Sequence, residues 1–156
     1  MLKKIISGGQ TGVDRAALDV AIQLGINHGG WMPRGRLAED GAVPARYQLQ
    51  EMPTEEYPAR TEKNVVESDG TLLISRGSPT GGTDYTRRMA LKHGKHLLHI
   101  DLSLGRRPAE AGSLIASWIE LNRIETLNVA GPRASHDASI YADSVNILTQ
   151  AFNRHR

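Results

Sequence analysis

Cysteine is absent from the 156 residues, which excludes disulfides, thiolate metal sites and cysteine nucleophiles. The sequence also lacks any apolar run near the ~18 residues that a membrane-spanning helix needs. The first strand starts close to Leu2 and leaves no room for a signal peptide, so we expect a cytoplasmic protein with no membrane partner. The net charge is only +2, and no strip of aromatic and basic residues is visible, so nucleic acid is not an expected partner. The six histidines do not have zinc-site spacing, and we expect no protein-bound metal.

Apolar strands alternate with amphipathic helices along the whole chain. This alternation predicts an α/β fold, with a parallel sheet of about five strands between two helical layers, in a single domain spanning residues 1–156. The helix from Val13 is expected to have Thr11 as its N-cap, with Asp14 completing a capping box, and to end at Gly25. The strands are expected at 2–7, 26–33, 70–75, 96–102 and 126–131. The helices are expected from Val13, across 56–68, across 86–93, from Pro108 and across 138–152.

A long loop with four prolines, residues 33–58, interrupts this pattern and has little periodicity. Such a stretch in a compact domain is usually functional or disordered. Trp31, Arg34 and Arg36 could stack on a flat heterocycle and hold a phosphate, or form a subunit interface or a surface arm. Glu39 and Asp40 could accept hydrogen bonds from the N–H groups of a ring.

Three loops that follow expected strands are rich in Gly, Ser and Thr and lead into a helix: 8–12, 76–84 and 131–135. Ligands of open α/β sheets bind beyond the carboxyl ends of the strands. Glycines let the backbone approach an anion closely, and a helix N-terminus offers free N–H donors, so such loops form phosphate cradles. Arginines add paired donors. The expected phosphate- and ligand-binding residues are Gly8, Gly9, Gln10, Thr11, Gly12, Arg15, Arg34, Arg76, Gly81, Gly82, Thr83, Gly131, Pro132, Arg133 and Ser135.

Alternatives remain for each of these residues. Any single glycine loop could serve tight packing alone. Asp14 could be a cap, orient Arg15 or contact a ligand hydroxyl, and Arg15 could face solvent or ligand. "GGQTGVDRA" lacks both the G-x-G-x-x-G spacing and a Walker A lysine, so a standard NAD or P-loop site is not expected. No catalytic residues are assigned.

The segments "SGGQTGVDRAALDVA", "WMPRGR", "ESDGTLLIS", "PTGGTDYT" and "VAGPRAS" together resemble the molybdenum-cofactor carrier proteins and their bacterial homologues, over nearly the whole chain. The wider group is Rossmann-like and includes DNA-processing protein A and the cytokinin-activating phosphoribohydrolases. The resemblance implies a circular permutation, in which "NVAGPRAS" corresponds to the first βα unit of that group and "SGGQTGVD" to the second. The implied strand order is 2-1-5-3-4. A homo-oligomer is implied as well.

The phosphoribohydrolases carry a catalytic glutamate in a P-G-G-x-G-T-x-x-E motif. Gly82 and Thr83 match its G-T pair, but Thr86 stands at the place of the glutamate. We therefore expect a binding or carrier protein rather than an enzyme. The leading hypothesis is a carrier of the molybdenum cofactor (molybdopterin), with molybdoenzymes as partners and a phosphorylated small molecule as ligand. The alternatives are a nucleotide-binding sensor or signalling module and a phosphoribohydrolase-like enzyme acting on a nucleotide.

Overall fold

The computed structural model describes residues 1–153; the last three residues of the expected domain, 154–156, lie outside the described part. Its centre is a five-stranded sheet of order β2-β1-β9-β7-β8 in which every pair of neighbours is parallel. Numbered by their order among these five strands, this is 2-1-5-3-4, so the expected fold class and strand order are confirmed. The strands are β1 (Lys4–Ile6), β2 (Asn27–Gly29), β7 (Gly70–Ser75), β8 (His96–Asp101) and β9 (Thr126–Ala130).

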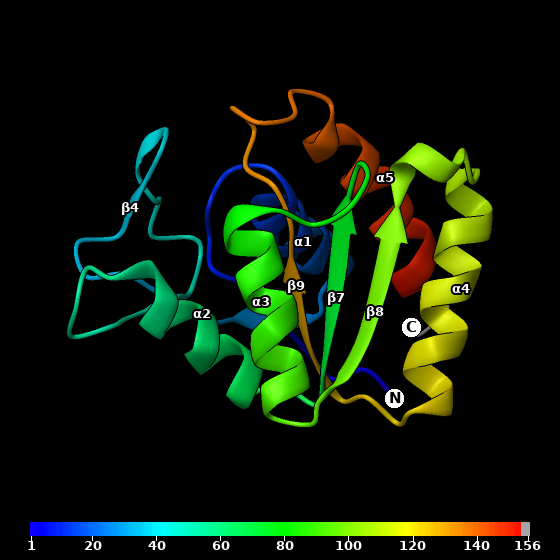
Figure 1. Ribbon diagram of the computed structural model, residues 1–156, viewed down its shortest axis with the longest axis horizontal. Coiled ribbons are helices and arrows are strands. Elements are labelled where there is room, and N and C mark those ends of the chain that lie inside the picture. Colours follow the sequence, from blue (N-terminus) through cyan, green and yellow to red (C-terminus); the bar gives the residue numbers. More distant parts are fainter. Residues whose placement is uncertain (154–156) are drawn as a thin grey trace.

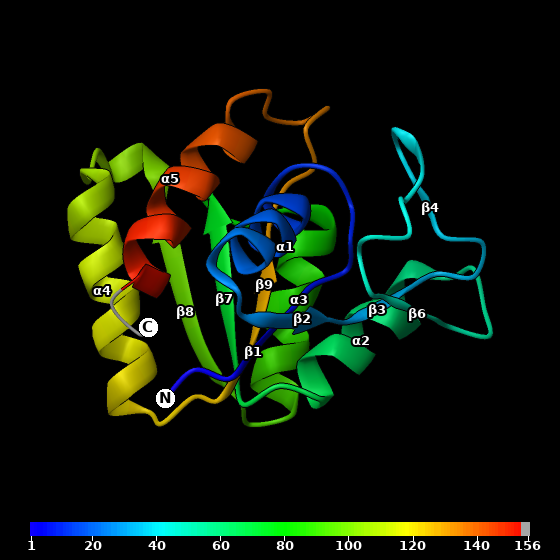
Figure 2. The same cartoon turned by 180° about the vertical axis from the view of Figure 1, so that it is seen from behind.

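Helices cover both faces of this sheet (Figure 1). α2 and α3 pack together on one face, and α1, α5 and α4 form the layer on the other, which Figure 2 shows from behind. The five helices are α1 (Val13–Leu24), α2 (Tyr57–Val66), α3 (Gly81–Lys92), α4 (Pro108–Leu121) and α5 (Ile140–Asn153). A short 3-10 helix, η1 (Leu102–Leu104), follows β8.

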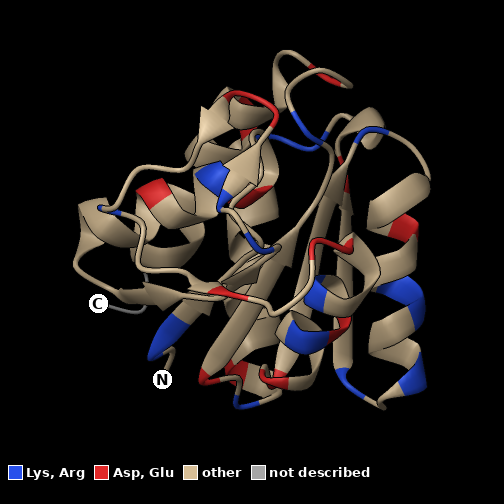
Figure 3. Ribbon diagram, turned by 90° about the vertical axis from the view of Figure 1, so that its left-hand side faces the viewer, with Lys and Arg blue, Asp and Glu red and all other residues tan. Residues whose placement is uncertain are grey.

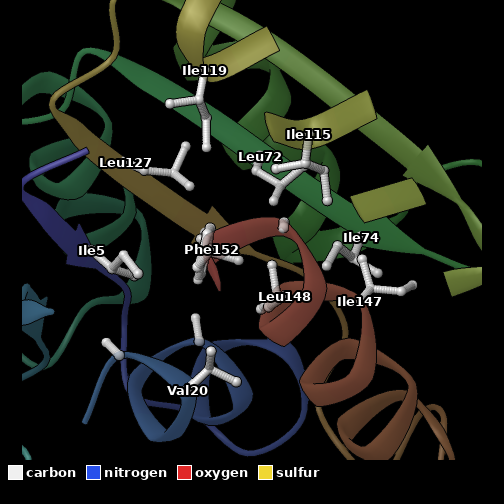
Figure 4. Close-up of a cluster of buried hydrophobic side chains, with 14 of the residues drawn as sticks. Ile5, Val20, Leu72, Ile74, Ile115, Ile119, Leu127, Ile147, Leu148 and Phe152 are labelled. Atoms are coloured by element: carbon white, nitrogen blue, oxygen red, sulfur yellow. The ribbon is translucent and has the colours of Figure 1, made fainter. Parts of the chain in front are cut away.

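The main hydrophobic core lies between the sheet and the layer of α1, α4 and α5 (Figure 4). Leu127 and Val129 of β9 point into it together with Leu72 of β7, and Phe152 of α5 is fully buried among them. Because side chains alternate along a strand, Asn128 points to the opposite face, toward α2 and α3. This alternation places a polar side chain on the face where the candidate site lies.

The stretch expected as a structureless loop contains three short strands, which corrects that expectation. β4 (Leu37–Ala38) and β5 (Gly41–Ala42) form a hairpin, while β6 (Gln50–Glu51) pairs in parallel with β3 (Trp31–Met32). The expected second strand, 26–33, is accordingly split between β2 and β3. We call residues 33–56 the arm; its hairpin projects from the body beside α2 (Figures 1 and 2).

Arg36 organises the arm from inside. Its guanidinium donates to four backbone carbonyls, those of Leu49, Val43, Pro44 and Tyr47. Backbone carbonyls in an irregular segment need such donors when they are withdrawn from water. The arginine thus replaces the hydrogen bonds that a regular sheet would supply.

The expected capping box at the start of α1 is wrong. Gly12, with φ of 79°, is the N-cap residue and no side chain caps the helix. The Thr11 hydroxyl contacts Glu39 and accepts from the Ala134 amide, while the Asp14 carboxylate accepts from the Gln10 amide. A left-handed glycine directly before the helix turns the Thr11 side chain away from the first helical amides. At the other end Gly25 adopts the left-handed conformation, which confirms the expected C-cap.

Candidate functional site

A cleft of about 430 Å³ opens at the carboxyl edge of the sheet, bordered by α2, the start of α3 and the loops that follow β1, β7 and β9. These three loops lie at the same end of the sheet in Figure 1. The parallel order with β9 between β1 and β7 is what brings them together. The expected site residues that line the cleft are Gly8, Gln10, Arg76, Gly81, Gly82, Thr83, Gly131, Pro132 and Arg133.

The segment after β7, residues 76–82, has its helix start open to the cleft; we call it the open loop. Within the described residues, the amides of Gly81 and Gly82 donate to no acceptor, whereas those of Thr83 and Asp84 bond back to the Thr80 carbonyl. A Cβ on either glycine would meet nothing within 4 Å. Ser78, Thr80 and Thr83 add hydroxyl groups to the same wall. Two free N–H groups at the start of a twelve-residue helix attract anions.

Three of the five amides in the loop after β1, residues 8–12, are paired with side chains; we call it the closed loop. The amides of Gly9, Gln10 and Thr11 donate to side chains of Ser7, Asp14 and Gln10 respectively. Its glycines are closely surrounded: a Cβ on Gly8 would lie 1.9 Å from Arg60 Nη1, at the end of a side chain, and one on Gly12 would lie 2.2 Å from the Pro132 carbonyl oxygen of the backbone. Gly9, Thr11 and Gly12 do not line the cleft.

The loop after β9 packs closely against its neighbours and contributes one cation to the cleft. The Val13 amide donates to the Pro132 carbonyl at 3.3 Å, and a Cβ on Gly131 would lie 2.3 Å from the carbonyl oxygen of Ile74. The Arg133 side chain lines the cleft and makes no hydrogen bond or ion pair with any of residues 1–153. Its charge therefore remains available to a ligand.

Arg60 of α2 is the second available cation, although only 9% of the residue is exposed. Nη1 donates to the Gly8 carbonyl at 2.6 Å, and the guanidinium lies over the Tyr57 ring, but no carboxylate among residues 1–153 forms an ion pair with it. Burial lowers the pKa of Arg60, and the nearby charge of Asp14 opposes that effect. A buried guanidinium with spare donors favours an anion from outside.

Asp14 is the buried carboxylate of the cleft. Burial raises its pKa to about 6, and Arg60, the Gln10 amide, Arg15 and Arg133 act against that shift. Its side chain forms no ion pair with these arginines, so its negative charge is not consumed in a contact among the described residues. Near neutral pH it is largely ionised, and it lies on a surface otherwise suited to anions.

Three predicted arginines are engaged elsewhere. Arg76 borders the cleft, but its guanidinium bonds Asp137 at 2.9 Å and Asp143 at 2.8 Å, which compensates its charge. Arg15 pairs with Asp40 at 3.0 Å, and Arg34 reaches Glu55 at 3.5 Å. Arg15 and Arg34 do not line the cleft.

Glu39, at the tip of the β4–β5 hairpin, ties the closed loop to the loop after β9. Its carboxylate accepts from the Thr11 hydroxyl, the Ser135 amide at 3.0 Å and the Ser135 hydroxyl at 2.6 Å. Its own amide donates to Gln10 Oε1 at 2.8 Å. Hydrogen bonds from Ser135 and Thr11 hold the pKa of this carboxyl below its ordinary value. The predicted donors Thr11 and Ser135 thus bind the carboxylate of Glu39 instead of a ligand, and they lie outside the cleft lining.

Several cleft residues were not identified by sequence reasoning. Arg60, Asn64, Thr86 and Asn128 all line the cleft, as does Tyr57. The helical period of 56–68 places Tyr57, Arg60, Thr61 and Asn64 on one face, and that spacing was the available signal. What the spacing does not show is that this face turns toward the sheet edge.

A contact between Ser75 and His99 lies at the base of the open loop. Ser75 Oγ lies 2.7 Å from His99 Nε2 and donates to the Gly77 carbonyl, while the Gly77 amide donates to Asp101. Hydrogen bonds from Ser103 and Gly77 lower the pKa of Asp101 to about 2. The network holds the turn at Gly77, so that the following residues approach the cleft in one arrangement.

Two kinds of feature are absent from residues 1–153. No group of three or more His, Asp or Glu side chains there could hold a metal ion, and no helix there is long and apolar enough to cross a membrane. On the side of the arm, basic and acidic residues are interspersed (Figure 3).

The parallel sheet between two helical layers, with a cleft at its carboxyl edge, is a Rossmann-like fold. The chain belongs to the family described as "Circularly permutated YpsA SLOG", whose model matches residues 5–152. It is similar to a crystal structure of a protein named "Putative molybdenum carrier protein" from Syntrophus aciditrophicus SB. The two are 53% identical with a TM-score of 0.93, and the match covers 96% of this chain and 94% of the other. None of the curated proteins that were compared matches the chain.

Proposed function

We propose that this protein is a carrier of the molybdenum cofactor, binding the pterin phosphate in the cleft without performing chemistry on it. The metal is part of the cargo, so the protein needs no metal ligands of its own. The name of the similar protein and the shared family support this proposal.

The observation that carries the proposal is the combination of free donors in one cleft. The Gly81 and Gly82 amides are unpaired at a helix start, and neither Arg60 nor Arg133 has a carboxylate partner within residues 1–153. A phosphate placed there would receive N–H donors from the helix start and charge-assisted hydrogen bonds from the arginines. The remaining volume accommodates a fused-ring heterocycle.

A carrying role is favoured over catalysis by the residue at the place of the phosphoribohydrolase glutamate. Thr86 is buried there, and its hydroxyl donates to the Gly82 carbonyl at 2.9 Å. A hydroxyl used to stabilise the first turn of α3 can neither take up a proton nor stabilise a developing positive charge as a carboxylate does. Binding without turnover fits this substitution.

The proposal is tested by titrating the purified protein with the cofactor under anaerobic conditions and following the pterin fluorescence. We expect saturable binding and slower oxidation of the bound cofactor in air. Serum albumin at equal concentration controls for nonspecific protection. If the cofactor fails to bind while a plain nucleotide binds tightly, the protein is a nucleotide-binding module and the carrier proposal is wrong.

A further inference from the structure

The floor of the cleft presents two hydrogen-bond acceptors that lack donors. Asn128 is 2% exposed; its Nδ2 donates to Thr71 Oγ1 at 3.2 Å, and its Oδ1 accepts nothing from residues 1–153. Asp14 is 7% exposed; its Oδ2 accepts from the Gln10 amide at 3.3 Å, and its Oδ1 likewise accepts nothing from the described residues. Both residues line the cleft.

Among the described residues, Ser144 Oγ is the one fully enclosed side-chain polar atom without a partner, so both Oδ1 atoms are accessible from the cleft. The carboxylate of Asp14 is the more demanding of the two, since it carries charge as well as lone pairs. A further hydrogen bond to Oδ1 must come from a group that enters the cleft. A ligand that covers this floor displaces water from both acceptors and must offer donors in its place, because acceptors left unpaired under a ligand cost free energy.

The cleft is therefore divided by its chemistry. The open loop offers N–H donors, which suit a phosphate, while Asp14 and Asn128 offer acceptors, which suit N–H groups. The charges of Arg60 and Arg133 act on Asp14 and are also open to a phosphate in the cleft. A second phosphate beside Asp14 would be repelled by its charge. The complementary ligand has an anion at one end and a donor edge at the other.

We infer that the cleft selects a heterocycle with a ring N–H next to an exocyclic amino group, bound with that donor edge on Asp14 and with its phosphate on the open loop. Guanine and the pterins share this edge, whereas adenine and hypoxanthine lack the paired arrangement. A carboxylate accepts from both N–H groups at once, as Asp and Glu accept from donor edges of bases. The inference rests on the proposed function and narrows its ligand class.

The experiment compares guanosine, inosine and adenosine 5′-monophosphates with a 6-substituted pterin phosphate by calorimetry at pH 7.5. Inosine monophosphate is the matched probe, because it differs from the guanosine compound only by the exocyclic amino group. We expect guanosine monophosphate to bind about tenfold or more tightly than the inosine compound, the value of a hydrogen bond to a charged group. The pterin arm shows whether a pterin or a guanine nucleotide is the better source of this edge.

Asp14→Asn removes the charge and keeps the size of the side chain. We expect this variant to lose most of the preference for guanosine over inosine monophosphate while keeping or raising its affinity for the inosine compound. A merely structural role of Asp14 would lower both affinities together. Asn128→Ala should reduce the preference by a smaller factor.

The wild-type protein provides a second test that needs no variant. At pH 5 a proton on Asp14 should reduce the guanosine-to-inosine affinity ratio, because the protonated carboxyl loses the charge that strengthens its hydrogen bond to the exocyclic amino group. The ratio cancels the titration of the phosphate, which both probes carry. If wild type binds both probes equally at pH 7.5, or if Asp14→Asn keeps the preference, the inference is overturned. If neither the nucleotide probes nor the pterin phosphate bind, both the inference and the proposed function are wrong.

Discussion

The closed loop and the open loop are both rich in glycine, and both run from a parallel strand into a helix, yet their glycines have different surroundings. In the closed loop, a Cβ on Gly8 or Gly12 would collide with a neighbour at 1.9 or 2.2 Å. In the open loop, a Cβ on Gly81 or Gly82 would meet nothing within 4 Å. The same residue type thus serves close packing in one loop and access to the backbone in the other.

The difference shows that a glycine-rich strand–helix turn is not by itself evidence of a phosphate site. The two loops differ in which amides at the turn already have acceptors. Those of Gly9, Gln10 and Thr11 do, while those of Gly81 and Gly82 do not, within the described residues. The following predictions separate the packing role from the binding role.

Gly12→Ala should have the largest effect on stability. The residue has φ of 79°, and its new Cβ would press on the Pro132 carbonyl oxygen. Left-handed strain and overpacking together should lower the free energy of unfolding by about 4 kcal/mol, as measured by urea denaturation. Gly82→Ala is the matched control: its φ is not positive and its surroundings are open, so stability should change by no more than about 1 kcal/mol. Equal losses in both variants would remove the distinction between the loops.

The group with the clearest pH signature, Asp14, lies in the first turn of α1, directly after the closed loop. Asp14 has an ordinary pKa of 3.8 when unfolded and about 6 when buried, so between these values the native state holds a proton that the unfolded chain has lost. Its contribution to stability is therefore greatest at low pH and is lost as pH rises from about 4 to 6, by up to roughly 3 kcal/mol.

Asp14→Asn should remove this contribution, so the difference in unfolding free energy between variant and wild type should shift in favour of the variant across that window. Denaturation at a series of pH values from 4 to 7 measures it. A difference that is constant with pH would contradict the buried, ionisable state of Asp14.

Arg60→Met should weaken the binding of inorganic phosphate by about tenfold or more, because a charge-assisted hydrogen bond is lost. Its folding stability should change little, since the loss of the hydrogen bond to the Gly8 carbonyl is offset by the removal of a buried guanidinium that has no ion pair among the described residues. Arg34→Met makes the same chemical change on an exposed side chain paired with Glu55, and phosphate affinity there should change less than about twofold. A larger effect at Arg34 than at Arg60 would indicate that phosphate binds at the arm and not in the cleft.

Glu39→Ala should have the smallest effect on binding. Removing the carboxylate frees the Thr11 hydroxyl and the Ser135 amide, so hydrogen exchange at Ser135 should become faster. Phosphate affinity should change less than about twofold, since neither residue lines the cleft. Unaltered exchange at Ser135 would show that the hairpin does not hold this loop.

The strands and helices were predictable because they depend on local periodicity, and the resemblance alone implied the order 2-1-5-3-4. The convergence of the three loops followed from that order. The function of each glycine was not predictable, because it depends on contacts distant in sequence: Gly8 with Arg60, Gly9 with Leu49 and Gly12 with Pro132. The capping assignment at Thr11 failed for a related reason, since the backbone at Gly12 is left-handed.

The burial of Arg60 was not predictable from the sequence either. A basic residue in a helix of mixed polarity is usually solvated, and burial here results from the way α2 packs beside the closed loop. Pairs such as Arg76 with Asp143 and Arg15 with Asp40 likewise join separate elements, so the sequence does not reveal which arginines are already compensated.

The claim that the open loop holds the phosphate is tested most directly by titrating isotope-labelled protein with inorganic phosphate and following the backbone amide resonances. The account predicts saturable shifts at Gly81 and Gly82, with smaller shifts at Gly9 and Thr11. Shifts concentrated in the closed loop, with Gly81 and Gly82 unchanged, would contradict it.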